Sequence, residues 1–451
     1  MSAALTRLRP ARAQGHRHLL TGSALLVVGA AIQALSGALF WFIAARLDVE
    51  ADVGAAAKLN TSVLFVTYLA GLGLPVSLAR YAAGRDRDSD VTFTWGVVAT
   101  VAAALVLAAV YIVVIPSDAV DVLSQTNRLL GPLAFAVIVA GSALSLIADV
   151  RCMTARRWNL VLVRITAVGL LRFPLLFVLR GGEDRAFWLF VWAAGPVALT
   201  GSVAALYSAR VAGGRHGLRP RPGSAGAAIR YSAVNYVSTL AYQAPYFALP
   251  VIVLANVSAR SYASFNVAWG IVAVAFYVPS AIGQALLAEG GRDGAHLRAQ
   301  VGLALLLALG LMAVGSLASF AGSTLVERVY GSGYHQAARV LPVMMAAGVP
   351  WAITSLLLSE VRILHRHAAT VVITVVLTVA VVVPALIAVP RDGVDGASAA
   401  WFIGNLVAGA VAIVTAAISR HRSRRADPAL DEPATAADAA EVGITLAEPT
   451  V

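Results

Sequence analysis

The sequence contains few charged residues and almost no cysteine. Only 13% of its 451 residues are Asp, Glu, Lys or Arg, whereas soluble globular domains have roughly 25%. Cys152 is the sole cysteine, which excludes an intramolecular disulfide bond and a metal cluster held by cysteines. The histidines show no metal-binding spacing, and the sequence has no Ser/His/Asp set and no phosphate-binding loop. We therefore expect no metal, no cofactor and no enzyme activity.

Long apolar runs are abundant instead, and hydrophobic residues make up 59% of the chain. Twelve runs each have about 20 residues or more, which is enough for a helix to cross roughly 30 Å of hydrocarbon. Continuous runs of this length span membranes as helices, because a helix satisfies its own backbone hydrogen bonds. We predict an all-α membrane protein with about twelve transmembrane helices. The predicted spans, numbered 1 to 12 in chain order, are residues 19–45, 59–79, 92–115, 130–148, 159–179, 186–209, 231–255, 262–288, 299–322, 340–359, 368–390 and 396–419.

The basic residues predict the orientation of these spans. The net charge is +11, and most of the positive side chains lie in the N-terminus, the even-numbered gaps between spans and the C-terminal tail. Positive residues stay on the cytoplasmic side, so we expect a multi-pass protein of the bacterial inner membrane with both termini in the cytoplasm. The positive charge is therefore not read as a nucleic-acid footprint. We interpret the first span as an uncleaved helix, because it is much longer than the apolar core of a signal peptide.

The chain divides at its midpoint into two sets of six spans. A linker rich in Pro, Gly and Arg separates them. The predicted domains are a basic N-terminus 1–18, an N-lobe 19–209, the linker 210–230, a C-lobe 231–419 and a disordered tail 420–451. The two sets show weak similarity at a shift of about 210 residues: span 4 ends in Ile147-Ala148-Asp149-Val150-Arg151, and span 10 ends in Leu358-Ser359-Glu360-Val361-Arg362. Six is even, so we expect parallel repeats, unless the similarity arose by chance.

Carboxylates are missing from the middle of the spans. All 23 Asp and Glu residues lie in gaps, in the tail or at span ends. An antiporter driven by protons or sodium usually carries a carboxylate within the membrane as its coupling site. The nearest candidates are Asp149, Glu289 and Glu360, and we interpret these as interface residues that form ion pairs with neighbouring arginines.

Two arginines lie inside span 5, where a charge is unfavourable unless it faces water, an anion or a fixed acceptor. Arg164 is close enough to the cytoplasmic end to reach the interface, and Arg172 is deeper, just before Pro174. One interpretation is an anion site in a cavity, because a guanidinium binds phosphate groups with two parallel hydrogen bonds. The alternative is that Arg164 reaches the interface and that backbone carbonyls freed by the proline satisfy Arg172.

Span 7 carries a polar face. Tyr231, Asn235, Ser238, Thr239, Tyr242, Gln243 and Tyr246 recur at helical spacing. Such a helix could line a hydrated path and bind sugar hydroxyls, or it could form hydrogen bonds to neighbouring helices. From this face we select Asn235, Thr239, Tyr242 and Gln243 as candidate substrate-binding residues. Gln33 and Arg46 of span 1 complete the candidate set together with Arg164 and Arg172.

Three short motifs resemble a known family. Residues 329–341, VYGSGYHQAARVL, are similar to the loop before the tenth span of polysaccharide flippases, which reads aromatic-Gly-x-x-Tyr-x-x-Ala-x-x-apolar-Leu. Gly71-Leu72-Gly73 with Ala79-Arg80 resembles the second span of those proteins, and residues 393–400 resemble the entry to the last. The resemblance covers roughly residues 19–420. The superfamily is that of the multidrug/oligosaccharidyl-lipid/polysaccharide (MOP) exporters.

This resemblance implies two six-helix lobes around a central cavity that opens alternately to the two sides. It also implies a flippase that moves a polyprenyl-pyrophosphate-linked oligosaccharide, a precursor of cell-surface polysaccharide, from the inner to the outer leaflet. The expected partners are this lipid-linked glycan, membrane lipids and a glycan polymerase or glycosyltransferases of the same pathway, with no nucleic acid. The main alternative is a multidrug or cation-coupled antiporter of the same fold, and the missing membrane carboxylates disfavour it. A membrane-embedded glycan polymerase or ligase is more distant, because such enzymes carry a large outer loop.

Overall fold

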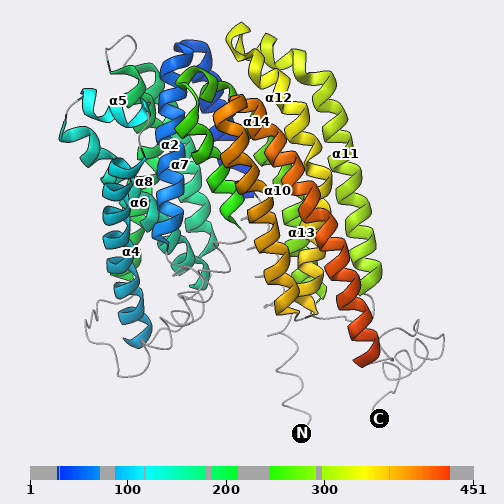
Figure 1. The fold of residues 1–451 in the computed structure, drawn as a ribbon. Coiled ribbons are helices and arrows are strands. Elements are labelled where there is room, and N and C mark those ends of the chain that lie inside the picture. The colour runs from blue at the N-terminus through cyan, green and yellow to red at the C-terminus, as the bar shows by residue number, and fades with distance from the viewer. Residues whose placement is uncertain are drawn as a thin grey trace, which may run out of the picture. The chain divides into compact units, whose positions relative to one another are not determined.

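The computed structural model is helical throughout the parts of the chain that it describes (Figure 1). These parts are residues 28–29, 31–71, 87–115, 118–126, 128–155, 157–178, 184–211, 243–290, 297–364 and 366–426. The helices are α2 (Glu50–Ala70), α4 (Arg87–Val114), α5 (Asp118–Thr126), α6 (Leu130–Thr154), α7 (Trp158–Val178), α8 (Arg185–Val211), α10 (Ala259–Gly290), α11 (Leu297–Tyr330), the 3-10 turn η2 (Ser332–Tyr334), α12 (His335–Ala346), α13 (Gly348–Ile363) and α14 (His367–Ala426). Two further helices span Ala31–Leu47 and Gln243–Asn256.

Each of the twelve predicted spans overlaps a described helix. Eight of the described helices are long and apolar enough to cross a membrane by themselves. The shorter helices Ala31–Leu47 and Gln243–Asn256 coincide with parts of spans 1 and 7, and α7 coincides with span 5. Spans 11 and 12 both lie in α14, which breaks at Gly393 with φ 58°. A positive φ is accessible to glycine at little steric cost, so Gly393 marks the boundary that hydropathy placed between residues 390 and 396.

The second span begins earlier than hydropathy predicted. We expected residues 59–79, but α2 starts at Glu50, and residues 72–86 lie outside the described part of the chain. Glu50 and Asp52 occupy the first turn, where acidic side chains interact favourably with the positive end of the helix dipole. As a consequence Lys58, which precedes the predicted span by one residue, lies well inside a helix.

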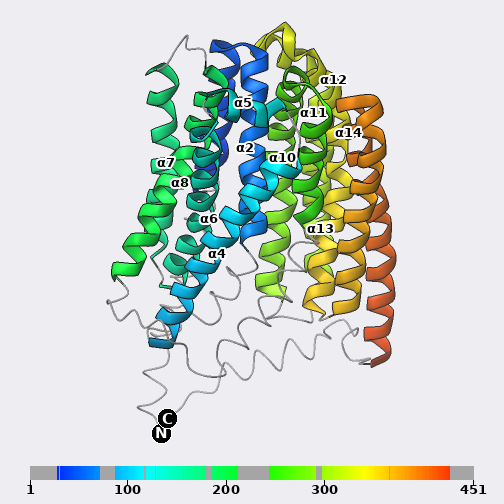
Figure 2. The same ribbon diagram turned by 60° about the vertical axis from the view of Figure 1, so that its left-hand side comes forward.

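Small residues allow α6 and α8 to approach closely. A Cβ atom added to Gly141 would lie 2.7 Å from the carbonyl oxygen of Ala198, and one added to Gly201 would lie 2.5 Å from the carbonyl oxygen of Gly141. The two helices run side by side, as Figures 1 and 2 show. Close backbone contact at small residues is the usual way for helices to associate in a bilayer, where lipid tails are as apolar as leucine.

Large aliphatic side chains face outward, while alanines face the protein interior. On α4, Val106 and Val113 are 62% and 83% exposed, whereas Ala104 and Ala108 are fully buried. The same arrangement recurs on α11, where Leu306 is 70% exposed. In water this exposed apolar surface would be unfavourable, and in hydrocarbon it is not. The protein is therefore a multi-pass membrane protein.

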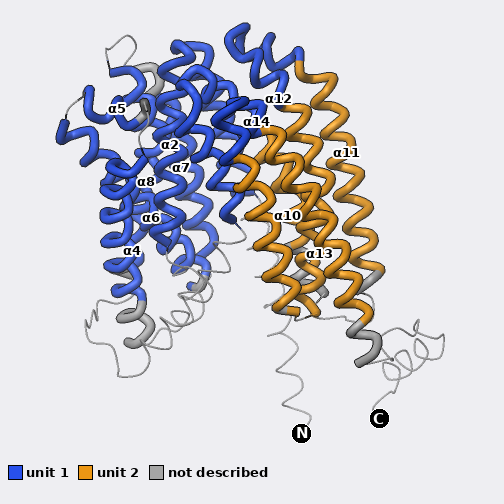
Figure 3. The backbone as a smooth tube through the Cα atoms, viewed as in Figure 1, with its two compact units in different colours: residues 1–270, 324–340, 386–397 blue, residues 271–323, 341–385, 398–451 orange. Residues whose placement is uncertain are grey.

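The chain forms two compact units (Figure 3). Unit 1 comprises residues 1–270, 324–340 and 386–397, and unit 2 comprises residues 271–323, 341–385 and 398–451. In unit 2, Trp351 of α13 donates a hydrogen bond to the Phe276 carbonyl of α10, and the Phe276 ring contacts Trp401 of α14. The predicted linker lies almost entirely outside the described residues, so the predicted lobe boundaries stay a prediction.

Candidate functional site

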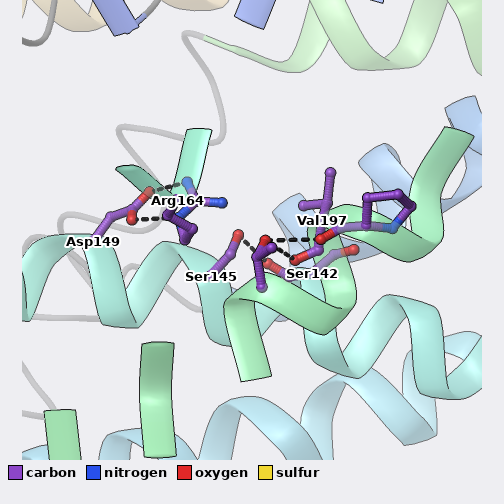
Figure 4. A network of polar contacts seen from close by, with 7 residues as sticks. Ser142, Ser145, Asp149, Arg164 and Val197 are labelled. Carbon is purple, nitrogen blue, oxygen red and sulfur yellow. Dashed lines mark hydrogen bonds and ion pairs between the residues drawn. The ribbon is translucent and has the colours of Figure 1, made fainter. Parts of the chain in front are cut away.

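Arg164 forms a tight ion pair with Asp149. Its Nε donates to Oδ1 of Asp149 at 2.7 Å and its Nη2 to Oδ2 at 2.5 Å, so α7 is joined to the end of α6 (Figure 4). The two side chains are 11% and 17% exposed. One turn earlier on α6, Ser145 donates to the Ser142 carbonyl within its own helix. Because its guanidinium already holds a carboxylate, Arg164 is available to another anion only if it leaves Asp149.

The pseudo-repeat partner of Asp149 forms an ion pair of the same kind. Glu360 of α13 is 2% exposed and accepts two hydrogen bonds of 2.6 Å from Nε and Nη2 of Arg420 on α14. The interpretation of Asp149 and Glu360 as ion-pair residues is therefore confirmed. The side chain of Glu289, the third candidate, lies outside the described part of the chain.

Within the described part of the chain, Arg172 is held through one of its three nitrogen atoms. Its Nε donates to the Ala193 carbonyl of α8 at 3.0 Å. Ala193 lies three residues before Pro196, in the turn that the proline ring perturbs. The acceptor therefore comes from the neighbouring helix and not from the turn before Pro174, as the alternative interpretation had assumed. Among the described residues, neither Nη group of Arg172 has a hydrogen-bond partner.

The Nη edge of Arg172 faces the first helix. A Cβ atom on Gly37 would lie 3.7 Å from Nη1, which is ordinary van der Waals contact, so the guanidinium lies against this helix. One turn below, Gly169 of α7 packs against Ser36 in the same way. A planar guanidinium that is fixed through Nε and keeps two Nη donors can bind a phosphate oxygen pair. This is the chemistry that an anionic headgroup requires.

The remaining candidates of span 1 occupy different levels of the same helix. Gln33 is exposed and lies one turn before Gly37, on the same helix face. Arg46 lies nine residues after Gly37, about 14 Å further along the helix axis. There its Nη2 donates to the Arg328 carbonyl at 3.0 Å and its guanidinium lies over the Phe42 ring. The structure thus brings Gln33 near the level of Arg172 and separates Arg46 from it.

Most of the polar face of span 7 lies outside the described residues. Of its four candidates, Asn235, Thr239 and Tyr242 are outside, and only Gln243 is described. Gln243 is the first residue of the helix Gln243–Asn256 and is half-buried. Tyr246, one turn later, packs against Trp269 of α10 with ring centroids 5.0 Å apart. The role of this face in binding sugar hydroxyls stays a prediction.

Lys58 is the charged residue that sequence reasoning missed. It is 1% exposed, although it is the only lysine of the chain. Its Nζ donates to the Val257 carbonyl at 2.5 Å and lies 5.9 Å from the centre of the Tyr262 ring. The signal was present in the sequence, because Ala55, Ala56 and Ala57 extend the apolar run to the other side of Lys58.

Solved structures with the same fold are transporters and a flippase. The lipid II flippase MurJ in an inward closed conformation superposes with a TM-score of 0.70 at 12% identity, covering 87% of each chain. An inward-facing multidrug resistance MATE family transporter of the MOP superfamily gives a TM-score of 0.62 at 18% identity, over 86% of this chain and 94% of that one. The Vibrio cholerae MATE transporter VcmN in its bent form gives 0.56 at 13% identity, over 90% and 97%. The chain has the MOP fold.

The MOP fold confirms the predicted fold class, an all-α membrane protein with about twelve helices. No protein-family model and no curated protein matches the sequence. The MOP fold is shared by multidrug transporters and a lipid II flippase, so the fold alone does not choose between them.

Proposed function

We propose that this protein is a flippase for a polyprenyl-pyrophosphate-linked oligosaccharide. It moves this precursor of a cell-surface polysaccharide from the inner to the outer leaflet of a bacterial cell membrane by alternating access. The barrier to this movement is the transfer of a polar glycan and a pyrophosphate through hydrocarbon. A cationic, hydrated path lowers the barrier while the polyprenyl chain stays in lipid.

The observation that carries the proposal is the state of Arg172. A guanidinium within a helical membrane bundle is retained at a large cost in solvation free energy. Here Nε is anchored to Ala193, and both Nη groups have no partner among the described residues. A fully structural arginine would use these donors, as Arg164 and Arg420 do. We assign Arg172 the first contact with the pyrophosphate.

The other candidate residues have secondary roles in this proposal. Arg164 joins the anion site only when Asp149 releases it. Asn235, Thr239, Tyr242, Gln243 and Gln33 form hydrogen bonds with the glycan, because sugar hydroxyls pair with amide and hydroxyl groups. Arg46 lies at the level where the headgroup leaves the path. A glycan polymerase or glycosyltransferases of the same pathway supply and consume the lipid-linked glycan.

The first prediction concerns Arg172. In proteoliposomes that hold an undecaprenyl-pyrophosphate disaccharide with a fluorescent label, Arg172→Ala should lower the flipping rate about tenfold or more. Hydrogen bonds to charged groups contribute about 1.5–3 kcal/mol each, which supports a loss of this size. Arg172→Lys should give an intermediate rate, because lysine keeps the charge but cannot donate from a planar fork. Flipping is measured by quenching of the label from outside.

The control for this experiment is Arg339→Ala, which removes the same charge from a pair with Asp395 whose side chains are 60% and 46% exposed. Its flipping rate should stay within a factor of two of the unmodified protein. An Arg172→Ala protein that flips the probe at an unchanged rate would exclude Arg172 from the binding site.

A multidrug or cation-coupled antiporter is the second candidate, because the MATE structures share the fold. A coupling carboxylate has to exchange its proton or sodium ion with water. Asp149 and Glu360 instead each accept two hydrogen bonds from an arginine, so both oxygens of each carboxylate are already occupied. Flipping that requires an imposed proton or sodium gradient, or drug efflux in the same vesicles, would favour the antiporter.

A further inference from the structure

The buried ammonium group of Lys58 caps the end of another helix. Val257 directly follows the helix Gln243–Asn256, and its own N–H donates to the Val253 carbonyl at 3.0 Å. The Val257 carbonyl, which accepts from Lys58 Nζ, is therefore one of the unsatisfied acceptors at the negative end of that helix. A lysine in this position satisfies the Val257 carbonyl. Its attraction to the negative helix end also offsets part of the free-energy cost of removing the ammonium group from water.

The residues around Lys58 form a polar contact with very close backbone approach. A Cβ atom on Gly54 would lie 1.7 Å from the Ala259 carbonyl oxygen, so the two backbones touch. Tyr262 donates from its hydroxyl to Thr61 at 2.8 Å. Residues 54, 58 and 61 lie on one face of α2. We call this contact the 58–257 seam, and it consists of Gly54, Lys58 and Thr61 on α2 with Val257, Ala259 and Tyr262.

A second set of polar contacts extends the seam toward the start of α2. Nε of Arg260 lies 3.2 Å from Glu50 Oε2. The Glu50 carboxylate also packs against Gly333, where a Cβ atom would fit only if the Glu50 side chain moved, next to Gly331 with φ 110°. Both glycines belong to residues 329–341, the segment that resembles the loop before the tenth span of polysaccharide flippases. The seam thus combines polar contacts with a close backbone approach at Gly54, and the Tyr262 ring is fully buried within it.

We propose that Lys58 is the latch of the 58–257 seam, and that the transport cycle requires its release from Val257. This inference rests on the proposed transport function, because it assigns the seam to one end of the path. A buried ammonium group can leave its carbonyl acceptor only for water or an anion, since hydrocarbon does not solvate it. Separation at Lys58 therefore opens the seam to an aqueous path and not to lipid. The seam joins residues from the two halves of the sequence, which is where alternating access requires a reversible contact.

The test measures the separation of the seam directly. Spin labels are placed at the exposed positions Val49 and Ala255 in a Cys152→Ser background, and their distance distribution is recorded in lipid nanodiscs. Lys58→Ala removes the ammonium–carbonyl bond and leaves a void in the closed seam, whereas the open state loses only a hydrated side chain. The Lys58→Ala substitution should therefore raise the ratio of the longer-distance to the shorter-distance population at least about tenfold.

A second variant guards against misfolding of the first. Gly54→Ala should shift the distribution in the same direction, because its methyl group has no room beside Ala259, while alanine favours the helix more than glycine does. The matched control is Ser145→Ala, a buried change in α6 away from the seam, which should leave the distribution unchanged. A shift for Gly54→Ala without one for Lys58→Ala would show that the seam opens but that Lys58 does not hold it. An unchanged distribution for both would make the seam permanent and overturn the proposal.

Transport is measured separately, so that the latch and the proposed function can fail independently. Glu50→Cys/Arg260→Cys, joined by a short bis-methanethiosulfonate reagent, should stop flipping of the fluorescent undecaprenyl-pyrophosphate probe, and dithiothreitol should restore it. Undiminished flipping by the cross-linked double-cysteine protein would contradict the proposal that the seam has to open during transport. If the unmodified protein does not flip the probe at all, the proposed substrate is wrong, and the spin-label distances still decide whether Lys58 holds the seam.

Discussion

At the scale of single residues, charged side chains inside the helices are each fixed by a specific oxygen acceptor. Some acceptors are carboxylates and some are backbone carbonyls. The pairs are Arg164–Asp149, Arg185–Asp48, Arg420–Glu360, Arg172–Ala193 and Lys58–Val257. Burying a charge is unfavourable unless it is paired and hydrogen-bonded, so each acceptor is needed for stability. Arg172 and Lys58 differ from the rest because the oxygen that each binds here is a neutral backbone carbonyl rather than a carboxylate.

The ion pair of Glu360 with Arg420 predicts an asymmetric effect of mutation. Glu360 is 2% exposed and Arg420 is 38% exposed. Arg420→Ala leaves a buried carboxylate without its partner and should lower the free energy of unfolding by about 3 kcal/mol. Glu360→Gln leaves an arginine that can reach water and should cost about 1 kcal/mol. Unfolding by sodium dodecyl sulfate in mixed micelles measures the free energy of unfolding of both variants. Equal decreases for Arg420→Ala and Glu360→Gln would contradict the predicted asymmetry.

At the scale of helices, glycines decide which elements can touch. Gly141 and Gly201 bring α6 and α8 into backbone contact, and Gly54 does the same for α2 and Ala259. Glycine is a poor helix former, by about 1 kcal/mol relative to alanine, so its presence within helices needs a packing reason. Those three glycines have one. Others, such as Gly310 of α11, have no atom within 4 Å of a Cβ position.

This difference predicts opposite results for one substitution at two helical glycines. Gly141→Ala places a methyl group 2.7 Å from the Ala198 carbonyl oxygen, so α6 and α8 have to separate, and the free energy of unfolding should fall by about 1–3 kcal/mol. Gly310→Ala should leave stability unchanged or raise it by up to about 1 kcal/mol. Thermal unfolding of the two variants in the same detergent compares them. A destabilised Gly310→Ala protein with a stable Gly141→Ala protein would reverse the assignment.

At the scale of the whole molecule, the distribution of apolar and basic residues determines how the chain meets the membrane. Exposed valines and leucines cover the described helices, and small residues fill their contacts. The gaps rich in arginine predict which ends of the spans face the cytoplasm, because positive residues near span ends stay on that side. The MOP fold agrees with the multi-pass arrangement, and the orientation itself stays a prediction.

Reporter fusions check that orientation. Green fluorescent protein fused after residue 426 or after residue 157 should fluoresce, because the basic residues place these positions in the cytoplasm. Alkaline phosphatase should be active only when it is fused after residue 128, in an odd-numbered gap. A fluorescent fusion after residue 128 together with active phosphatase after residue 157 would invert the topology and the proposed direction of transport.

The positions of the helices could be predicted from the sequence, because hydropathy is a local property. Each of the twelve predicted spans overlaps a described helix, and the pairing of Asp149 and Glu360 with arginines was expected. The helix of the second span starts earlier than predicted, since a window scan ends an apolar run at a charge. Only the contact of Lys58 with Val257 shows that this charge is accommodated within the protein. The acceptor of Arg172 was also missed, because Ala193 is brought to it by helix packing.

The sequence by itself determined that this is a helical membrane protein, roughly where its spans lie, and that Arg164 and Arg172 carry charge inside one of them. These features follow from the free energy of transferring each segment to hydrocarbon, which depends on composition alone. Only the tertiary structure decided which acceptor each charge has: a carboxylate for Arg164, a helix end for Lys58, and a single carbonyl for Arg172. Hydrogen bonds require partners within about 3 Å, and residues distant in the chain reach that distance only through folding.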